Sequence, residues 1–225
     1  MFSRVKNTMR SLATVAALAL FCGVCLAQAP ENQSASPLGN KDAAKSETAI
    51  GDLVTDAMKK QVRTDVAFVP ACELKPKDTP FPAGTIAPAD IEALVSYPDD
   101  PLAVLELPGK TIRLALEKSV SIYPQPYLGF LQVAGLRFTF DPKKPPGERV
   151  TSITVGATPI NDAATYTVAV TNTMANGALG YWKVWSKDRV KDRRDRVKIV
   201  TALDAFFKTN PKIDYGTLDR ITILK

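Results

Sequence analysis

Residues 128–150 read Leu128-Gly-Phe-Leu-Gln-Val-Ala-Gly-Leu-Arg-Phe-Thr-Phe-Asp-Pro-Lys-Lys-Pro-Pro-Gly-Glu-Arg-Val150. From Leu131 to Phe140 the apolar residues recur with the period of two that is typical of a strand with one buried face. The alternation stops at Asp141-Pro142 and restarts at Val150, after a segment rich in Pro, Lys and Gly. Because proline fixes φ and glycine permits tight turns, the pattern predicts a strand, a rigid turn and a second strand.

Outward from this stretch, helical and strand patterns are interspersed along the chain. A helix is predicted to open at Ser46, since apolar residues at positions 50, 53, 54, 57 and 58 fall on one helical face. Further helices are predicted over 87–95, 110–120 and 201–208, the last with Asp204 as a capping residue. Further strands are predicted at 65–69, 102–107, 153–155, 166–170 and 220–224. Together they predict a single α+β domain with a mixed β-sheet and packed helices.

The first 27 residues have the pattern of a secretory signal peptide. Three basic residues and no acidic one accompany an apolar run from Leu12 to Leu26, and small residues follow. The run is too short, and wrongly flanked, for a membrane-spanning helix. We therefore expect cleavage after Ala27 and a secreted or periplasmic protein without a membrane span. A lipid anchor on Cys22 or Cys25 is the alternative.

Residues 28–45 are polar and rich in Ala, Ser, Asn and Pro. They are predicted to form a flexible leader ahead of a domain spanning 46–225. Without the signal peptide the net charge falls by its three basic residues, from +6 to +3. Cys72 is then the one cysteine, so no intrachain disulfide is expected. It is either a small buried hydrophobic residue or a reactive thiol.

Four fragments stand in a shared order along the chain. They are the helix 47–57, the turn Pro82-Ala-Gly-Thr-Ile86, the junction Leu107-Pro-Gly-Lys110, and the segment 131–150 with its Asp141-Pro142 turn. In this order and spacing they resemble the C-terminal, substrate-recognition domain of secreted 5′-nucleotidases. The resemblance covers nearly all of 46–225, and it implies that family's fold and a site for a nucleotide.

The family's catalytic half is a metallophosphoesterase domain that holds two metals with His, Asp and Asn ligands. The chain has no histidine, and two-metal hydrolysis needs several ligands and a positioned water. Asp99 and Asp100 are adjacent, and they form either a solvated turn or part of a metal site. We expect no catalytic residue, no bound metal and no cofactor, and a stand-alone domain without the metallophosphoesterase half.

In the family, three loops hold the ligand, and each has changed here. An Asn-Gly-Gly-Gly-Ile-Arg loop, which meets phosphate, corresponds to Pro70–Lys75. Lys75 keeps a cation there, while Glu73 adds negative charge near the place of the phosphate. A Pro-Phe-Gly-Asn segment, which stacks on the base, corresponds to Tyr97–Asp100. The resemblance makes Lys75, Tyr97 and Asp100 candidate ligand residues, and a solvated or packed loop is the alternative for each.

The third loop is an Asn-Phe-x-Ala-x-Gly-Gly-Asp-Gly-Tyr segment, and it corresponds to Asn172–Tyr181. Thr173 replaces the second stacking Phe, and Leu179 replaces the Asp that binds the sugar. Asn172 and Thr173 are the candidate ligand residues of this loop. The glycines and Tyr181 that persist are expected to be scaffold.

Residues 187–198 contain seven basic and three acidic residues. This run predicts either a solvated helix or loop laced with weak ion pairs, or a surface for an anionic partner such as phospholipid, a cell-wall polymer or nucleic acid. Trp182 and Trp185 precede the run and are expected to pack it onto the domain. No aromatic residue lies within the run, so we expect no nucleic-acid binding.

Three functions follow from this pattern. The first is an exported, non-catalytic module that binds a nucleotide-like or other small anionic ligand, or a separate metallophosphoesterase partner. The second is a hydrolase of the 5′-nucleotidase type, alone or in complex with such a partner. The third is a structural scaffold whose pocket has been lost.

Overall fold

The structure is a computed structural model that describes residues 31–225. The expected signal peptide, 1–27, lies outside the described residues. The helices are α1 Ala49–Val62, α2 Pro88–Glu92, α3 Gly109–Ser119, α4 Asn172–Ala175 and α5 Ile199–Thr209, with 3-10 turns η1 Ala71–Glu73, η2 Ala178–Lys183 and η3 Lys187–Arg189. The strands are β1 Gln33–Ser34, β2 Val66–Pro70, β3 Gly84–Thr85, β4 Pro101–Pro108, β5 Leu131–Ala134, β6 Leu136–Phe140, β7 Val150–Val155, β8 Thr158–Pro159, β9 Thr165–Thr171, β10 Val190–Lys198, β11 Lys212–Ile213 and β12 Ile221–Ile223.

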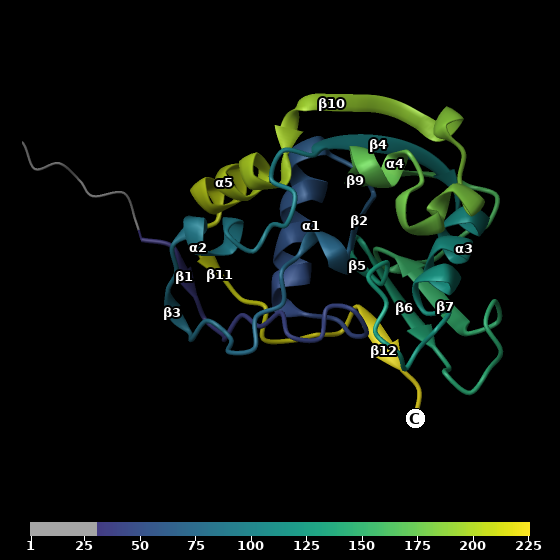
Figure 1. The fold of residues 1–225 in the computed structure, drawn as a ribbon, viewed down its shortest axis with the longest axis horizontal. Coiled ribbons are helices and arrows are strands. Elements are labelled where there is room, and N and C mark those ends of the chain that lie inside the picture. Colours follow the sequence, from purple (N-terminus) through teal and green to yellow (C-terminus); the bar gives the residue numbers. More distant parts are fainter. Residues whose placement is uncertain (1–30) are drawn as a thin grey trace, which may run out of the picture.

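A five-stranded sheet in the order β10-β4-β9-β2-β5 runs through the centre of the molecule (Figure 1). Strands β2 and β9 are parallel, and the other neighbours are antiparallel. A four-stranded sheet, β12-β6-β7-β8, and a small sheet, β11-β1-β3, lie at its sides. The predicted α+β class with a mixed sheet is confirmed.

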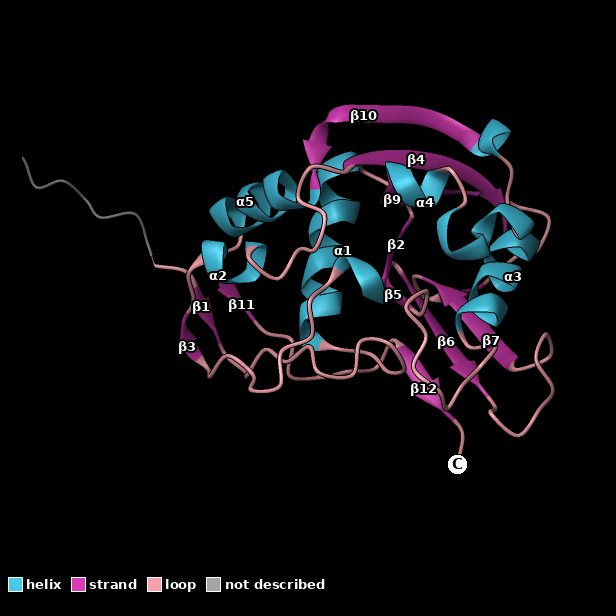
Figure 2. Cartoon of the chain, in the orientation of Figure 1, coloured by secondary structure: helices cyan, strands magenta, loops and turns pink. Residues whose placement is uncertain are grey.

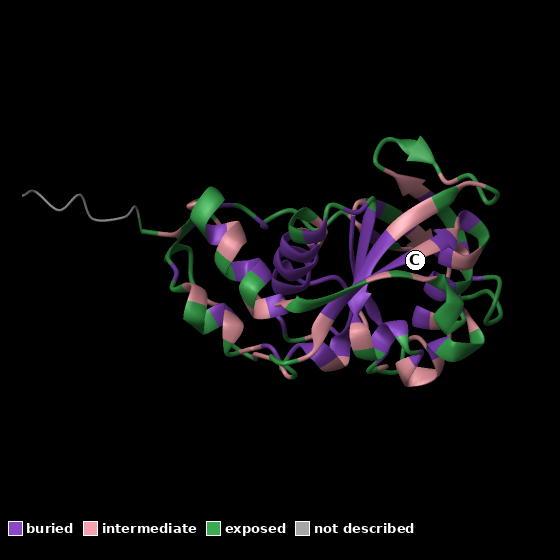
Figure 3. Ribbon diagram, turned by 90° about the horizontal axis from the view of Figure 1, so that it is seen from above, coloured by how far each residue is buried: buried purple, intermediate pink, exposed green. Residues whose placement is uncertain are grey.

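Both faces of the central sheet are covered, and β2 shows why. Val66 and Phe68 enter one hydrophobic core, while Ala67 and Val69 enter the other, as the alternation of side chains along a strand requires. The first core also takes in α3, η2 and the four-stranded sheet, and the second takes in α1, α2 and α5. Helix α1 is buried around most of its circumference (Figure 3).

Residues 131–140, predicted as one strand, form the two strands β5 and β6. Gly135 separates β5 from β6 and has a φ of 78°, in the left-handed region that favours glycine. A Cβ on Gly135 would lie 2.0 Å from the Asp65 carbonyl oxygen. The chain turns there, so β5 joins the five-stranded sheet and β6 the four-stranded one (Figure 2).

The predicted strand, turn and strand are confirmed as the antiparallel pair β6–β7. Within the turn, Asp141 Oδ1 accepts a hydrogen bond from the Lys143 amide at 2.9 Å. The Glu117 carboxylate of α3 accepts bonds from the amides of Arg149 and Val150, at 3.0 and 2.6 Å. These hydrogen bonds join the start of β7 to helix α3.

The segment predicted as a flexible leader is, from residue 31 onward, part of the fold. β1 pairs with β3 and β11, and Leu38 is fully buried. The Gln132 side-chain amide of β5 donates to the carbonyls of Ala43 and Ser46, at 3.0 and 2.7 Å. The polar composition of the segment gave no sign of this order, because backbone pairing and the buried Gln132 side chain hold the segment in place.

Two helix starts also differ from their predictions. Thr48, and not Ser46, caps α1, because its hydroxyl accepts the Gly51 amide at 3.0 Å. Helix α5 begins at Ile199, and Thr201 accepts the Lys198 amide at 2.8 Å. The capping role predicted for Asp204 is thus held by Thr201.

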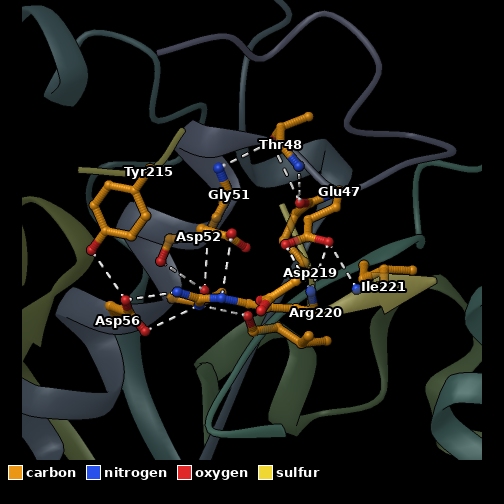
Figure 4. A network of polar contacts seen from close by, with 12 residues as sticks. Glu47, Thr48, Gly51, Asp52, Asp56, Tyr215, Asp219, Arg220 and Ile221 are labelled. Atoms are coloured by element: carbon orange, nitrogen blue, oxygen red, sulfur yellow. Dashed lines mark hydrogen bonds and ion pairs between the residues drawn. The ribbon is translucent and has the colours of Figure 1, made fainter. Parts of the chain in front are cut away.

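A buried polar network joins α1 to the C-terminal strand (Figure 4). Arg220 forms a two-pronged contact with Asp56, at 3.0 and 2.9 Å, and its Nε lies 3.3 Å from Asp52. The Glu47 carboxylate accepts the amides of Arg220 and Ile221 at 2.9 and 2.8 Å. Strand β12 is therefore held beside β6 by side chains from the far end of the sequence.

The basic run, predicted as a helix or loop, forms η3 and the edge strand β10, which pairs antiparallel with β4. Lys191 pairs with Glu106, Arg194 with Asp192 and Lys198 with Asp99, all on the surface. Charged side chains on an edge strand discourage pairing with other chains. Protection of an edge strand therefore explains many of the charged residues of 187–198 without an anionic binding partner.

Trp185 and Trp182, which precede this run, differ in their environment. Trp185 packs on Tyr181 with ring centroids 4.9 Å apart, whereas Trp182 is exposed. The expected packing role therefore holds for Trp185 alone. In residues 31–225 no helix is long and apolar enough to cross a membrane.

Candidate functional site

The five predicted ligand residues lie on segments that follow strands β2 and β9 or precede strand β4, and two of them, Asn172 and Thr173, are in helix α4. The parallel strands β2 and β9 end at Pro70 and Thr171, and the antiparallel β4 begins at Pro101. Leu102 of β4 is paired with Thr171 of β9. The carboxyl ends of parallel strands are a common location of ligand sites in α/β sheets.

Three of the five residues lie together and bond within the protein. The Thr173 amide donates to the Asp100 carboxylate at 3.0 Å. Asn172 opens the short helix α4, and its side-chain oxygen accepts from Arg193 of β10. These contacts occupy one Asp100 oxygen and the Asn172 side-chain oxygen.

Glu73 lies behind this group, and it is 98% buried. Its Oε1 accepts the Thr171 hydroxyl at 3.0 Å, and its Oε2 has no hydrogen-bond partner within residues 31–225. Burial, together with the nearby Asp100 charge, raises the pKa of Glu73 to about 7. Glu73, in the segment matched to the phosphate-binding loop, and the nearby Asp100 are both carboxyl groups, and negative charge on them disfavours an anion.

Lys75 and Tyr97 lie elsewhere, in the wall of a pocket of about 300 Å³ that we call the Lys75–Tyr97 pocket. It is lined by Asn40, Lys41, Ala43, Ala44, Ala71, Cys72, Leu74, Lys75, Pro76, Ser96, Tyr97 and Leu128. Asp100, Asn172 and Thr173 are not among the lining residues. The predicted site is therefore divided into a pocket and a hydrogen-bonded cluster.

Backbone pairing fixes the two loops that form this pocket. Leu74 and Val95 form an isolated β-bridge. The Lys75 amide donates to the Leu94 carbonyl at 2.7 Å, and the Ser96 amide donates to the Glu73 carbonyl at 2.8 Å. The loop after β2 and the loop before β4 are thus held side by side.

One wall of the pocket comes from the segment that was predicted as a leader. Asn40 is fully buried, and its side-chain amide donates to the Lys75 carbonyl at 2.9 Å. Its side-chain oxygen accepts the Thr48 hydroxyl at 2.9 Å. Lys41 was not predicted as a site residue because its segment was taken for a flexible leader. A buried asparagine among polar residues has no periodic pattern, so nothing in the sequence indicated that this segment lines a pocket.

The pocket combines an apolar wall with basic groups. Leu128 and Tyr97 of the lining keep 62% and 57% of their surface exposed, so the pocket offers apolar surface that a ligand could cover. The Lys75 ammonium donates to the Ala93 carbonyl at 2.9 Å. Across the described part of the chain, neither Lys41 nor Lys75 forms an ion pair.

Cys72 is half-buried in the same wall. Burial, with the Glu73 charge beside it, raises the pKa of the Cys72 thiol to about 11. The thiol is therefore protonated at neutral pH, and of the two alternatives the environment favours a small hydrophobic residue over a reactive nucleophile.

The third loop is scaffold around Tyr181. This tyrosine is fully buried, and its hydroxyl donates to the Gly129 carbonyl at 2.8 Å. Leu179 takes a left-handed φ of 57°, and its carbonyl accepts the Tyr127 hydroxyl at 2.8 Å. Leu179 stands where the family resemblance expects the sugar-binding Asp, and the structure uses its backbone carbonyl for a hydrogen bond within the protein.

Asp99 and Asp100 do not gather further ligands. Asp99 is exposed and pairs with Lys198 at 2.6 Å, and this contact lowers the Asp99 pKa. Within residues 31–225, no group of three or more His, Cys, Asp or Glu side chains could hold a metal ion. Of the two alternatives for this acidic pair, the contacts favour a solvated turn.

Solved structures share this fold over most of the chain. The 5′-nucleotidase precursor of Thermus thermophilus superposes with a TM-score of 0.75 and 28% identity, over 88% of this chain and 40% of that one. The NAD nucleotidase of Haemophilus influenzae superposes with a TM-score of 0.72 at 16% identity, over 88% of this chain and 39% of that one. The second likeness shows the fold alone.

Sequence comparisons agree with the structural ones. Human 5′-nucleotidase is 31% identical over 153 residues, which are 60% of this chain and 26% of that protein. The chain therefore spans about a quarter of the length of this relative. The sequence model described as "5'-nucleotidase, C-terminal domain" matches residues 26–186. The chain belongs to the 5′-nucleotidase C-terminal domain family.

Proposed function

We propose that the chain is an exported, non-catalytic binding module that takes a small nucleotide-like or anionic ligand. Export is supported by the signal-peptide pattern of the first 27 residues. The family relationship supports small-molecule recognition, and the Lys75–Tyr97 pocket supplies a concave site with an apolar wall and two lysines. This pocket is the observation that carries the proposal.

Catalysis by the chain alone is not part of the proposal. The family's metallophosphoesterase chemistry uses histidine ligands, and the sequence has none. Titratable groups with raised pKa values, Glu73 and Cys72, lie in or beside the pocket wall without a base or metal to act with. Buried and self-contained, they are better suited to structure than to group transfer.

A second candidate is a module that works with a separate metallophosphoesterase partner. The observation that favours it is the length of the relatives, since this chain covers only 40% of the Thermus thermophilus protein. In such a pair the hydrolytic groups would come from the partner, and this chain would contribute recognition. A scaffold without any ligand is the remaining alternative.

Isothermal titration of the purified chain from residue 28 tests the binding proposal. AMP, adenosine and UDP-sugars are each titrated, with and without Mn²⁺ or Mg²⁺. Saturable heat with at least one of them is expected, and replacement of Tyr97 by Ala should weaken it. Absence of heat for every ligand at millimolar concentration would leave only the partner or scaffold functions.

A further inference from the structure

We propose that the Lys75–Tyr97 pocket binds an amphipathic monoanion smaller than a nucleotide. An apolar or aromatic body lies against Tyr97, Leu128 and the alanine wall, and a carboxylate or similar group is held by Lys41 and Lys75. This inference rests on the proposed function, and it names the ligand class for that site.

The apolar half of the site is carried by exposure and by shape. Tyr97 and Leu128 both line the pocket and are two of the most exposed large apolar side chains of the described residues. Ala43, Ala44 and Ala71 line the same cavity. A flat or aliphatic group placed there would remove this apolar surface from water, worth roughly 25 cal/mol for each Å² buried.

The anionic half is carried by the lysines. The Lys75 ammonium has three donors, and the Ala93 carbonyl takes one of them at 2.9 Å. This contact leaves the other two donors of the Lys75 ammonium free. Lys41, in the same lining, has no carboxylate within ion-pair distance in the described structure. The proposal places a carboxylate where both lysines of the lining can donate charge-assisted hydrogen bonds to it.

A nucleotide fits the arrangement less well. The pocket volume of about 300 Å³ is at the small end of the usual range for ligand sites, about 300–1,000 Å³. The groups that would extend a ligand toward the inherited phosphate position are Glu73 and Asp100, and both are carboxyl groups. A compact ligand with one negative charge avoids them.

The walls are fixed before any ligand arrives. The Leu74–Val95 bridge joins two of the loops, and Asn40 joins the third wall to the Lys75 carbonyl. A preformed site needs little ordering on binding, so that modest contacts give measurable affinity.

The test uses three probes with one body and different charge: 4-phenylbutyrate, 4-phenyl-1-butanol and 4-phenylbutylamine. Each is titrated into the isotope-labelled chain from residue 28, and amide chemical shifts are followed by NMR. The carboxylate is expected to bind at least about tenfold more tightly than the alcohol, a difference of about 1.4 kcal/mol. The amine should be the weakest. The largest shifts are expected at the amides of Cys72, Leu74 and Ser96.

Variants assign the effect to named groups. A Lys41→Gln/Lys75→Gln double variant should bring the carboxylate to the affinity of the alcohol, while Tyr97→Ala should weaken all three probes. Lys110→Gln, on α3 and outside the pocket lining, should change nothing. All of these changes replace exposed side chains, and far-ultraviolet circular dichroism checks that the fold is retained.

Several outcomes would overturn the inference. They are equal binding of the three probes, shifts that map away from the pocket, a double variant that binds like the parent, and no binding of the carboxylate at millimolar concentration. If AMP gives the same saturable heat in the double variant and in Tyr97→Ala as in the parent, the pocket assignment fails while the proposed function stands. If no nucleotide and no probe binds, the proposed function fails as well.

Discussion

Asp52 lies in the first turn of α1 and is 99% buried. The Nε of Arg220 lies 3.3 Å from its carboxyl group. The Arg220 guanidinium makes its two-pronged contact with Asp56, so it offers Asp52 only its Nε. Burial first, and then the nearby Glu47, outweigh that contact and raise the pKa of Asp52 to about 9. Asp52 therefore carries a proton at neutral pH in the folded chain.

This raised pKa predicts that stability falls as pH rises. In the unfolded chain Asp52 loses its proton near pH 4, and in the folded chain it keeps the proton up to about pH 9. Folding therefore binds a proton across this window, and the free energy of unfolding should fall by up to about 1.4 kcal/mol per pH unit. Urea unfolding between pH 8 and pH 8.5 measures the slope, since Glu73, with a pKa of about 7, is by then largely ionised, and the Cys72 thiol of the folded chain is still protonated.

Two substitutions separate the contribution of Asp52 from others. Asp52→Asn, which keeps the shape and cannot ionise, should flatten the slope in this window. Glu73→Gln, which changes a second buried carboxyl group, should leave the slope unchanged. A slope that persists in Asp52→Asn would show that Asp52 is ionised in the folded chain.

At the residue scale, the candidate ligand residues were only partly predictable. The family resemblance named Lys75, Tyr97, Asp100, Asn172 and Thr173 as candidates, and in the structure the last two lie in the short helix α4. Their division into a pocket and a closed cluster depends on side-chain hydrogen bonds, which no pattern in the sequence encodes. Whether any of them touches a ligand stays a prediction.

At the element scale, Arg220 connects the C-terminal strand β12 to helix α1. Its side chain is 17% exposed and also donates to the Val133 carbonyl at 3.0 Å. Arg220→Met should lower the free energy of unfolding by about 3 kcal/mol, because it removes the two-pronged contact with Asp56 and leaves that carboxylate without a counter-charge. Hydrogen exchange should show the amides of β12 opening first.

Arg137→Met is the matched control for this substitution. Arg137 pairs with Asp219 at 3.3 Å on the surface, and both side chains are more than half exposed. Its loss should change the free energy of unfolding by less than about 1 kcal/mol. Equal effects of the two substitutions on the free energy of unfolding would contradict the proposal that Arg220 holds β12 against α1.

Elements with an apolar period were predictable from the sequence, and elements defined by their partners were not. The β6–β7 pair and helices α1 and α3 follow from alternation and helical spacing. The split at Gly135 was missed because the apolar period continues across it. The edge strand β10 was missed because a strand of charged residues has no apolar alternation, and its pairing with β4 decides its conformation.

At the scale of the whole molecule, family membership and binding function rest on different residues. Segment 131–150, Tyr181 and the strands β2, β4 and β9 build the two cores. Lys41 and Lys75 line the Lys75–Tyr97 pocket, where we propose that a ligand binds. The proposal is therefore of a family fold that binds a ligand and has no catalytic activity of its own.

Phosphate release by the purified chain from residue 28 tests this account most directly. The chain is incubated with AMP and UDP-glucose, each with Mn²⁺, Mg²⁺ or Zn²⁺, and inorganic phosphate is measured against a buffer control. The account predicts no release above background, because the sequence has no histidine for the family's metal centre. Metal-dependent release that scales with the amount of chain, and that Asp100→Asn or Glu73→Gln abolishes, would contradict it.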